Sequence, residues 1–368
     1  MQNDNGNILT EVNKTNARKI RLKGLTLPEL QHYFIEKGEP KFRAEQVFNW
    51  MYNHLADDFS EMKNLPKSLR LSLNESAEIN TLQLSAAEIS AETGTKKFVF
   101  LTKDNNVIES VIIPESRRTT LCISTQVGCP LDCKFCATGL MGYRKNLTAG
   151  EIFDQYKIAS KDYGRNNITN IVYMGMGEPL LNYNETIKSL EIFGEELTTG
   201  VSLKKITVST AGITPKIKEL ADTGLNVKLA FSLHSCFEST RAKIMPINKK
   251  YPLAGNIEAL KYYTQRTRTR ITFEYVMLRD LNDSDKDLNA LVKLCSQIPS
   301  KVNVIPFNSL KHMNPSGFSA SLEPTPRKRI DEFVQKLRDK NVTVIVRFTQ
   351  GEDIAAACGQ LAAKYNRV

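Results

Sequence analysis

Three closely spaced cysteines are the part of this 368-residue sequence with the clearest chemical meaning. Cys129, Cys133 and Cys136 have the spacing C-x3-C-x2-C and follow a short apolar stretch. Structural zinc sites and ferredoxin-type clusters take four protein ligands for each metal centre. Three thiolates at this spacing therefore favour a metal centre that keeps one position open for a substrate or cofactor.

The cysteine at position 122 leaves an alternative open. Cys122 lies seven residues before Cys129 and could complete a four-thiol structural zinc site. Such a site would suit a non-enzymatic, zinc-bound RNA-binding module. The other cysteines, Cys236, Cys295 and Cys358, are scattered along the chain, and a buried core cysteine is the ordinary explanation for an isolated one.

The composition is that of a globular protein with a large core. Hydrophobic residues make up 41% of the chain, which supports one large domain and a smaller one. No apolar run approaches the roughly 18 residues of a membrane span, and the first residues lack the pattern of a signal peptide. We therefore expect a cytoplasmic protein with no membrane partner, whose seven cysteines are mostly reduced.

The balance of charge favours a polyanionic partner. Lys and Arg outnumber Asp and Glu by 50 to 40, and the formal net charge is +10, which is typical of proteins that bind nucleic acid. Between Lys14 and Arg43 there are eight basic residues and three acidic ones. For any single basic cluster, a solvated helix surface is the simpler interpretation.

The spacing of apolar residues predicts the elements that must position the cysteines. Up to about Ser90 the spacing is helical, so we expect a small helical accessory domain, residues 1–92, that binds RNA. Residues 97–102 and 107–113 flank a turn and predict a β-hairpin. The hairpin would begin a core domain, residues 93–368, in which strands alternate with helices.

Repeated strand-then-helix units predict an α/β fold with a parallel sheet and helices outside it. About six such units can curl into a partial, open β/α barrel, in which ligands bind at the C-terminal ends of the strands. The cysteine run follows the first of these strands. The expected strands are residues 121–127, 168–174, 205–209, 227–233, 271–278, 302–307 and 342–348, and expected helices include 149–162, 214–222, 285–297 and 327–338.

Polar residues at the ends of the other expected strands point to one shared site. Each of them alone is more often a helix cap or a satisfied hydrogen-bonding group than a ligand contact. Their agreement in position favours a common cavity. They are Glu178, Ser209, Ser232, His234 and Asn308, and their neighbours Gly177 and Leu233 are candidates through the backbone. Cys358 is a further candidate, because a glycine follows it directly and places it at a helix end or in a loop.

Four short stretches around these residues resemble one family. The C-x3-C-x2-C run resembles the hallmark of radical S-adenosylmethionine (radical SAM) enzymes. The stretches LCISTQVGC, GMGEP, MPIN and AACGQL resemble those of RNA adenine C2-methyltransferases of the RlmN family. The resemblance runs from about Pro40 to Leu361.

The resemblance implies two cofactors. Cys129, Cys133 and Cys136 would hold a [4Fe-4S] cluster whose fourth iron binds S-adenosylmethionine, and the seven strand-end residues would contact S-adenosylmethionine. Two molecules of S-adenosylmethionine would be used per turnover, one to methylate Cys358 and one to generate the radical that activates this methyl group. A transient protein–RNA adduct would follow, and an external one-electron reductant would be required.

The resemblance also assigns two further residues and the substrates. Cys122 would release the methylated base by forming a disulfide with Cys358, and Glu109 would accept a proton. The substrates would be adenosines in the peptidyl-transferase region of 23S rRNA and 3′ of the anticodon in tRNA, modified by a monomer. A Cfr-like adenine C8-methyltransferase is the alternative, and Pro179 after Glu178 favours the C2 enzymes.

Overall fold

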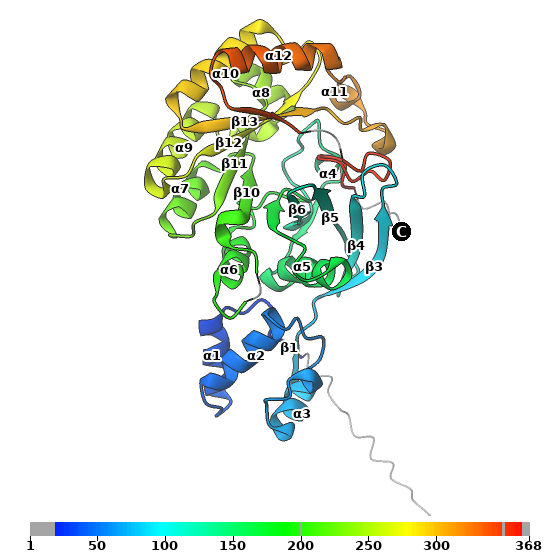
Figure 1. Ribbon diagram of the computed structural model, residues 1–368, viewed down its shortest axis with the longest axis vertical. Helices are drawn as coiled ribbons and strands as arrows, with labels where there is room; N and C mark the ends of the chain where they lie inside the picture. The colour runs from blue at the N-terminus through cyan, green and yellow to red at the C-terminus, as the bar shows by residue number, and fades with distance from the viewer. Residues whose placement is uncertain (1–18, 199, 348–349, 363–368) are drawn as a thin grey trace, which may run out of the picture.

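A ten-stranded sheet forms the centre of the molecule, and its strands lie side by side in the order in which they occur in the chain (Figure 1). The computed structural model describes residues 19–198, 200–347 and 350–362. From edge to edge the strands are β3 (Leu82–Ile89), β4 (Lys96–Thr102), β5 (Val107–Glu115), β6 (Arg118–Cys122), β9 (Asn170–Tyr173), β10 (Ile206–Thr210), β11 (Lys228–Ser232), β12 (Ile271–Met277), β13 (Ser300–Pro306) and β14 (Val344–Val346).

The direction of the strands changes at β6. The pairs from β3 to β6 are antiparallel, as in a hairpin meander, and every pair from β6 to β14 is parallel. β3 and β14 stand at the two edges, so the curved sheet is a partial barrel. The predicted α/β fold with an open β/α barrel is confirmed.

Amphipathic helices cover the outer face of the parallel strands (Figure 1). In α12 the buried residues Ile330, Phe333, Val334 and Leu337 recur at helical spacing, so one stripe packs against the sheet and the rest faces water. The helices are α5 (Ala149–Tyr163), α6 (Tyr183–Gly194), α7 (Thr214–Asp222), α8 (Glu238–Ile244), α9 (Leu253–Thr267), α10 (Asp285–Gln297) and α12 (Arg327–Asp339), with short α4 (Ala137–Leu140) and α11 (Gly317–Ala320). No helix in the described ranges is long and apolar enough to cross a membrane.

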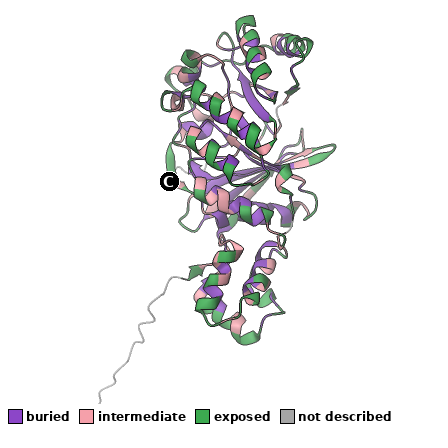
Figure 2. Cartoon of the chain, turned by 90° about the vertical axis from the view of Figure 1, so that its left-hand side faces the viewer, coloured by how far each residue is buried: buried purple, intermediate pink, exposed green. Residues whose placement is uncertain are grey.

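A small N-terminal domain projects from the core as a lobe (Figure 2), and its buried residues belong to the same hydrophobic cluster as the core. It contains α1 (Leu27–Glu36), α2 (Phe42–Tyr52) and α3 (Lys67–Ser76), and β1 (Ile20–Arg21) pairs with β2 (Ala77–Glu78) beneath them. Thr26 and Glu29 form a capping box that starts α1. The lobe is tied to the core by Lys23, whose ammonium lies 3.5 Å from the carboxylate of Asp154 on α5.

Most predicted elements are confirmed within a few residues, and two are wrong. The helical pattern expected up to about Ser90 fails at Leu82–Ile89, which is β3 and pairs with β4 in the large sheet. The strand predicted at 121–127 ends at Cys122. The division at residues 92 and 93 stays a prediction, and β3 lies before it.

The chain leaves the large sheet after Cys122 because buried polar groups there find partners outside the strand ladder. The amide of Ser124 donates to the side chain of Gln155, and its hydroxyl donates to the carbonyl of Glu109. The next strand, β7 (Gln126–Gly128), pairs instead with β8 (Tyr143–Asn146). This small two-stranded sheet carries the chain directly into the cysteine loop. The strand predicted at 342–348 shortens to β14, and residue 348 lies outside the described residues.

Candidate active site

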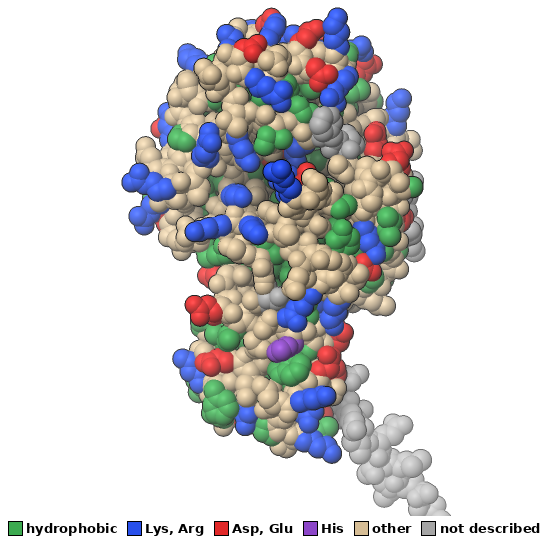
Figure 3. All heavy atoms as spheres, viewed as in Figure 1, with side chains coloured by type: hydrophobic (Ala, Val, Ile, Leu, Met, Phe, Trp, Pro, Cys, Tyr) green, Lys and Arg blue, Asp and Glu red, His purple; other side chains and the backbone are tan. Residues whose placement is uncertain are grey.

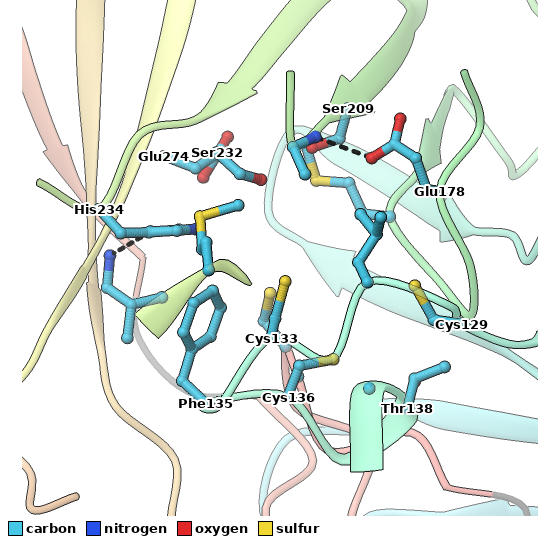
Figure 4. A pocket seen from close by; sticks show the side chains of 18 of the residues that line it. Cys129, Cys133, Phe135, Cys136, Thr138, Glu178, Ser209, Ser232, His234 and Glu274 are labelled. Atoms are coloured by element: carbon cyan, nitrogen blue, oxygen red, sulfur yellow. Dashed lines mark hydrogen bonds between the residues drawn. The ribbon is translucent and has the colours of Figure 1, made fainter. Parts of the chain in front are cut away.

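A first cavity at the C-terminal ends of the parallel strands gathers most of the predicted residues. Together with its opening to solvent it spans about 1010 Å³. Figure 4 shows the three thiols grouped in one part of this cavity, with Glu178, Ser209, Ser232 and His234 around the rest. The predicted residues in its wall are Cys129, Cys133, Cys136, Gly177, Glu178, Ser209, Ser232, His234, Asn308 and Cys358.

Close backbone packing holds the cysteine loop in place. The amide of Cys129 donates to the carbonyl of Gly142 over 2.8 Å. Gly128 has a φ of +73°, and a side chain there would collide with the same carbonyl. A Cβ atom on Gly139 would lie 2.9 Å from the backbone nitrogen of Cys133. The loop therefore depends on two glycines to bring its thiols to the cavity.

The three thiols fit a cluster better than a single ion. Burial raises the pKa of Cys129 to about 12 and also raises the pKa values of Cys133 and Cys136, so stable thiolates there need bound cationic metal. Within the described residues, no group of three His, Cys, Asp or Glu side chains converges on one metal position. Thiols that do not converge on one point suit a [4Fe-4S] cluster, in which each thiolate binds a different iron. They do not suit a closed zinc site, in which all ligands bind one ion.

The carboxylate of Glu178 is held by backbone N–H groups at the cavity wall. Its Oε2 accepts from the amide of Ala211 over 2.7 Å, and its Oε1 accepts from the amide of Leu180 over 3.0 Å. Burial raises the pKa of Glu178 to about 7, although these donors favour the ionised form. A bound cation would shift the group to its carboxylate form, so Glu178 suits the ammonium group of a ligand.

Gly177 gives Glu178 its position. Gly177 has a φ of +99°, and a Cβ atom there would lie 2.5 Å from the side chain of Gln126. The amide of Glu178 donates to the Gln126 side chain over 2.8 Å. Only glycine allows the loop to approach Gln126 this closely.

His234 is a neutral donor at the opposite wall. Its Nδ1 accepts from the amide of Val276 over 3.0 Å, which leaves the proton of the neutral ring on Nε2. Burial lowers the pKa of His234 to about 3. The ring of Phe135, which comes from the cysteine loop, packs edge-on at 4.5 Å. Phe135 thereby connects the cysteine loop to the end of β11.

A second cavity of about 1030 Å³ lies beside the first, and Cys358 lines both. Cys122 lines the second cavity and not the first, which removes it from any four-thiol zinc site. Asn308 donates to the carbonyl of Cys358 over 3.0 Å. The carbonyl of Gly359 accepts from the amide of Ala137 over 2.7 Å. The C-terminal segment is thus docked on the cysteine loop.

The two thiols of the second cavity share one cation. Burial raises the pKa of Cys122 to about 12, and enclosure by the cavity walls raises that of Cys358 to about 11, although the Cys358 side chain is in contact with solvent. The guanidinium of Arg347 lowers both values. Arg347 also lies 3.9 Å from Glu274, which lines the first cavity. The Arg347–Glu274 pair therefore stands between the two cavities.

Comparison with known proteins identifies the chain. Residues 20–79 match the ribosomal RNA large subunit methyltransferase N-terminal domain, and residues 123–292 match the radical SAM superfamily. The dual-specificity RNA methyltransferase RlmN of Alcanivorax borkumensis is 44% identical over 95% of this chain and 92% of its own length. This chain belongs to the RlmN family. RlmN of Geotalea uraniireducens is 43% identical, over 95% of this chain and 98% of its own.

A solved structure supports the same family. A radical SAM methyltransferase from Sphaerobacter thermophilus matches with a TM-score of 0.86 and 40% identity, covering 94% of this chain and all of the other. RlmN family membership makes this protein an RNA methyltransferase, and the radical SAM fold implies a [4Fe-4S] cluster and S-adenosylmethionine. The zinc-bound binding module considered above is wrong.

Two predicted residues of this RlmN family member lie outside both cavities. The side chain of Leu233 is buried in the hydrophobic core, so only its backbone could meet a ligand. Glu109 on β5 is buried and lines neither cavity. The catalytic role of Glu109 stays a prediction.

The structure around Cys358 bears on the predicted disulfide and on the predicted position of Cys358 at a helix end or in a loop. All seven cysteines are free thiols, so a Cys122–Cys358 bond formed during turnover stays a prediction. Residues 354–361 form turns and not a helix. Gly359, with a φ of +80°, lies directly after Cys358 in this turn.

Sequence reasoning missed four residues that organise the RlmN site. Arg241 is fully buried and donates to the carbonyls of Ala211 and Ser232 and to the side chain of Asn248 over 2.5 Å. Asn248 belongs to the MPIN stretch, which was the available signal. The strand alternation of residues 271–277 could have found Glu274. Nothing in the local sequence marks Phe135 or Arg347.

Proposed function

We propose that this protein methylates C2 of adenosines in 23S rRNA, in the peptidyl-transferase region, and in tRNA, 3′ of the anticodon. The RlmN relatives are named as dual-specificity RNA methyltransferases. The observation that carries the proposal is the position of Cys358 at the wall between a cavity with three clustered thiols and a second cavity that holds Cys122. We propose that the protein acts as a monomer in the cytoplasm.

The first cavity would hold both cofactors. Cys129, Cys133 and Cys136 would bind the [4Fe-4S] cluster, and Glu178 would bind the ammonium group of S-adenosylmethionine. When bound, the cluster supplies the electron that cleaves the sulfonium of S-adenosylmethionine. Further contacts to S-adenosylmethionine would come from Gly177, Ser209, Ser232, the Leu233 backbone, His234 and Asn308.

Cys358 would carry the methyl group because C2 of adenine cannot take it directly. C2 is a poor nucleophile with no acidic proton, so displacement on a sulfonium is not available to it. The Cys358 thiolate forms its S–C bond as the methyl–sulfonium bond of a first S-adenosylmethionine breaks. The radical produced by cleavage of a second S-adenosylmethionine then removes a hydrogen atom from the S-methyl group. The resulting methylene carbon forms a bond to C2, which joins protein and RNA.

Cys122 would release the product. Its thiolate attacks the sulfur of Cys358, the S–S bond forms, the bond from sulfur to the new methylene carbon breaks, and this carbon takes up a proton to become the methyl group of the product. Before this step the adduct radical gives one electron to an external acceptor and its C2 proton to a base, for which we propose Glu109, two residues along β5 from the Val111 that pairs with Cys122. An external reductant supplies two electrons to reopen the disulfide and one to the cluster.

The test is the identity of the methylated base. Anaerobically reconstituted protein is incubated with S-adenosylmethionine, a reductant and either a 23S rRNA fragment or tRNA, and nucleosides are separated by mass spectrometry. We expect 2-methyladenosine from both RNAs. A product containing 8-methyladenosine would favour the Cfr-like alternative, and the absence of any methyladenosine would overturn the proposal.

A further inference from the structure

The inner face of the sheet can be traced from the strand register. Residues paired across parallel strands project to the same face. Ser232 pairs with Glu274, and Glu274 pairs with Asn303. Ser232 and Glu274 both line the first cavity, so this row marks the inner face near the C-terminal ends of the strands.

Three basic residues occupy the same inner face at the other end of the strands. Side chains alternate along a strand, so residues two or four apart share a face. Lys228 lies four residues before Ser232, Lys301 two before Asn303, and Arg118 four before Cys122. We call Arg118, Lys228 and Lys301 the cationic rim.

The positive charge of the cationic rim is neutralised only in part. Within the described residues, neither Lys228 nor Lys301 forms a salt bridge, and Arg118 pairs only with Glu115. Burial and the nearby charges of Lys228 and Arg118 lower the pKa of Lys301. Glu115 pairs with Arg118, and the charge of Glu274 acts against the lowering of the Lys301 pKa, so three cations face two carboxylates, an excess of positive charge that favours a polyanion. Figure 3 shows Lys and Arg side chains bordering a hollow on one face of the core.

The second cavity runs from Arg118 of the cationic rim to the two thiols. Glu115, Arg118 and Thr120 line it towards the N-terminal end of β6, and Cys122 and Cys358 line it at the other end. Arg118 is exposed, so the cavity reaches the surface at the rim. Four residues of strand span about 13 Å, a length that a phosphate, a ribose and an extruded base can occupy in sequence.

We propose that the RNA approaches from the N-terminal ends of the strands, where the cationic rim binds phosphates beside the target adenosine. The target base then enters the second cavity towards Cys122 and Cys358. This inference rests on the proposed function and names the entrance and the phosphate-binding residues of the same site. It places the substrate entrance at the end of the barrel opposite the cofactor cavity.

The test compares charge removal at the rim with the same change elsewhere. Binding of a fluorescent tRNA anticodon stem-loop is measured by anisotropy at several salt concentrations. Each phosphate contact contributes about 0.7 to the salt slope for single strands. Lys228→Gln with Lys301→Gln should therefore lower the slope by about 1.4 and the affinity at 0.1 M salt by roughly 25-fold.

Two matched double variants complete the experiment. Lys228→Arg with Lys301→Arg should keep the affinity and slope of the wild-type protein. Lys328→Gln with Lys340→Gln removes two exposed charges at α12 and should change neither. Unchanged binding by the Gln rim variant, or an equal loss of affinity in the α12 variant, would overturn the proposal that the cationic rim binds RNA phosphates. If RNA binding depends on the cationic rim but the wild-type protein makes no methyladenosine, the proposed reaction is overturned and the proposed phosphate-binding role of the cationic rim is retained.

Discussion

At the scale of single residues, Cys122 and Cys358 are expected to act at different steps although they line one cavity. Cys358→Ala should bind RNA but accept no methyl group and form no adduct. Cys122→Ala should still be methylated at Cys358 and should accumulate a covalent protein–RNA species, because the thiol that breaks the adduct is missing. Denaturing gels with labelled RNA and peptide mass spectrometry measure both outcomes.

Cys295 on α10 offers a control for these variants. It is a free, partly buried thiol outside both cavities, so Cys295→Ala should turn over like the wild-type protein. Normal turnover by Cys122→Ala, or an RNA adduct formed by Cys358→Ala, would contradict the assigned roles.

Because Glu178 is buried, we expect the unfolding free energy of the protein without cofactors to fall as pH rises. Its pKa is raised by burial from the ordinary value of 4.5 to about 7 in the folded protein, so the folded state binds the proton more tightly than the unfolded state. The resulting stability is complete below pH 4.5 and is lost as pH rises to about 7. At 1.36 kcal/mol per pKa unit, the loss amounts to about 3 kcal/mol.

The measurement is denaturant unfolding of wild-type protein and Glu178→Gln between pH 4.5 and 8. The amide cannot titrate, so the difference in unfolding free energy between the two proteins should change in favour of the variant as pH rises. A difference that is independent of pH would show that Glu178 does not hold a proton in the folded state.

Residue types and spacing were sufficient to predict that three thiols gather at one cavity, because all three lie within eight residues of one loop. The same was true of the polar strand ends, whose position follows from the parallel sheet. Arg347 was not predictable in this way. Its role depends on Cys122, Cys358 and Glu274, which come from distant parts of the chain and meet only in the folded protein.

At the scale of elements, the loop after β9 is expected to depend on Gly177. Gly177→Ala would place a non-glycine residue at a φ of +99° and a Cβ atom 2.5 Å from Gln126. The loop must move, and the hydrogen bond that places Glu178 would break. We expect a stability loss of about 1–2 kcal/mol or more and at least tenfold weaker S-adenosylmethionine binding, measured by calorimetry.

Gly38 provides the control for backbone strain alone. It has a φ of +74°, and a Cβ atom there would meet nothing within 4 Å. Gly38→Ala should cost about 1–2 kcal/mol of stability and leave S-adenosylmethionine binding unchanged. Equal binding by both variants would show that Gly177 does not position the cofactor site.

Elements were predicted well where apolar periodicity was long, as in α7 and α10, whose bounds match the predicted 214–222 and 285–297. They were predicted poorly where tertiary contacts decide. The strand at 121–127 breaks because Gln155 and Glu109 satisfy the polar groups of Ser124. Local periodicity cannot reveal partners that lie so far away in sequence.

At the scale of the whole molecule, the N-terminal lobe is expected to depend on Lys23. Its ammonium is fully buried, donates to the carbonyl of Met51 over 2.9 Å and lies 3.5 Å from Asp154 of the core. Removing one partner of a buried pair typically costs about 3–5 kcal/mol. Lys23→Ala should lower the unfolding free energy by this amount and speed proteolytic release of the lobe.

Lys63 is the matched control for this change. It is exposed on the same lobe and forms no salt bridge within the described ranges, so Lys63→Ala should change stability by less than about 0.5 kcal/mol. A similar proteolysis rate for the two variants would mean that the lobe is held mainly by apolar contacts.

The sequential order of the strands bears on how the protein is made. Every strand after β3 finds its neighbour already synthesised, so the sheet can grow in one direction while the chain emerges from the ribosome. Cys122 belongs to the fourth strand of this series, and Cys358 follows the last. The thiol proposed to accept the methyl group thus reaches its place only after all strands of the sheet have formed, together with the segment that completes the wall of the first cavity.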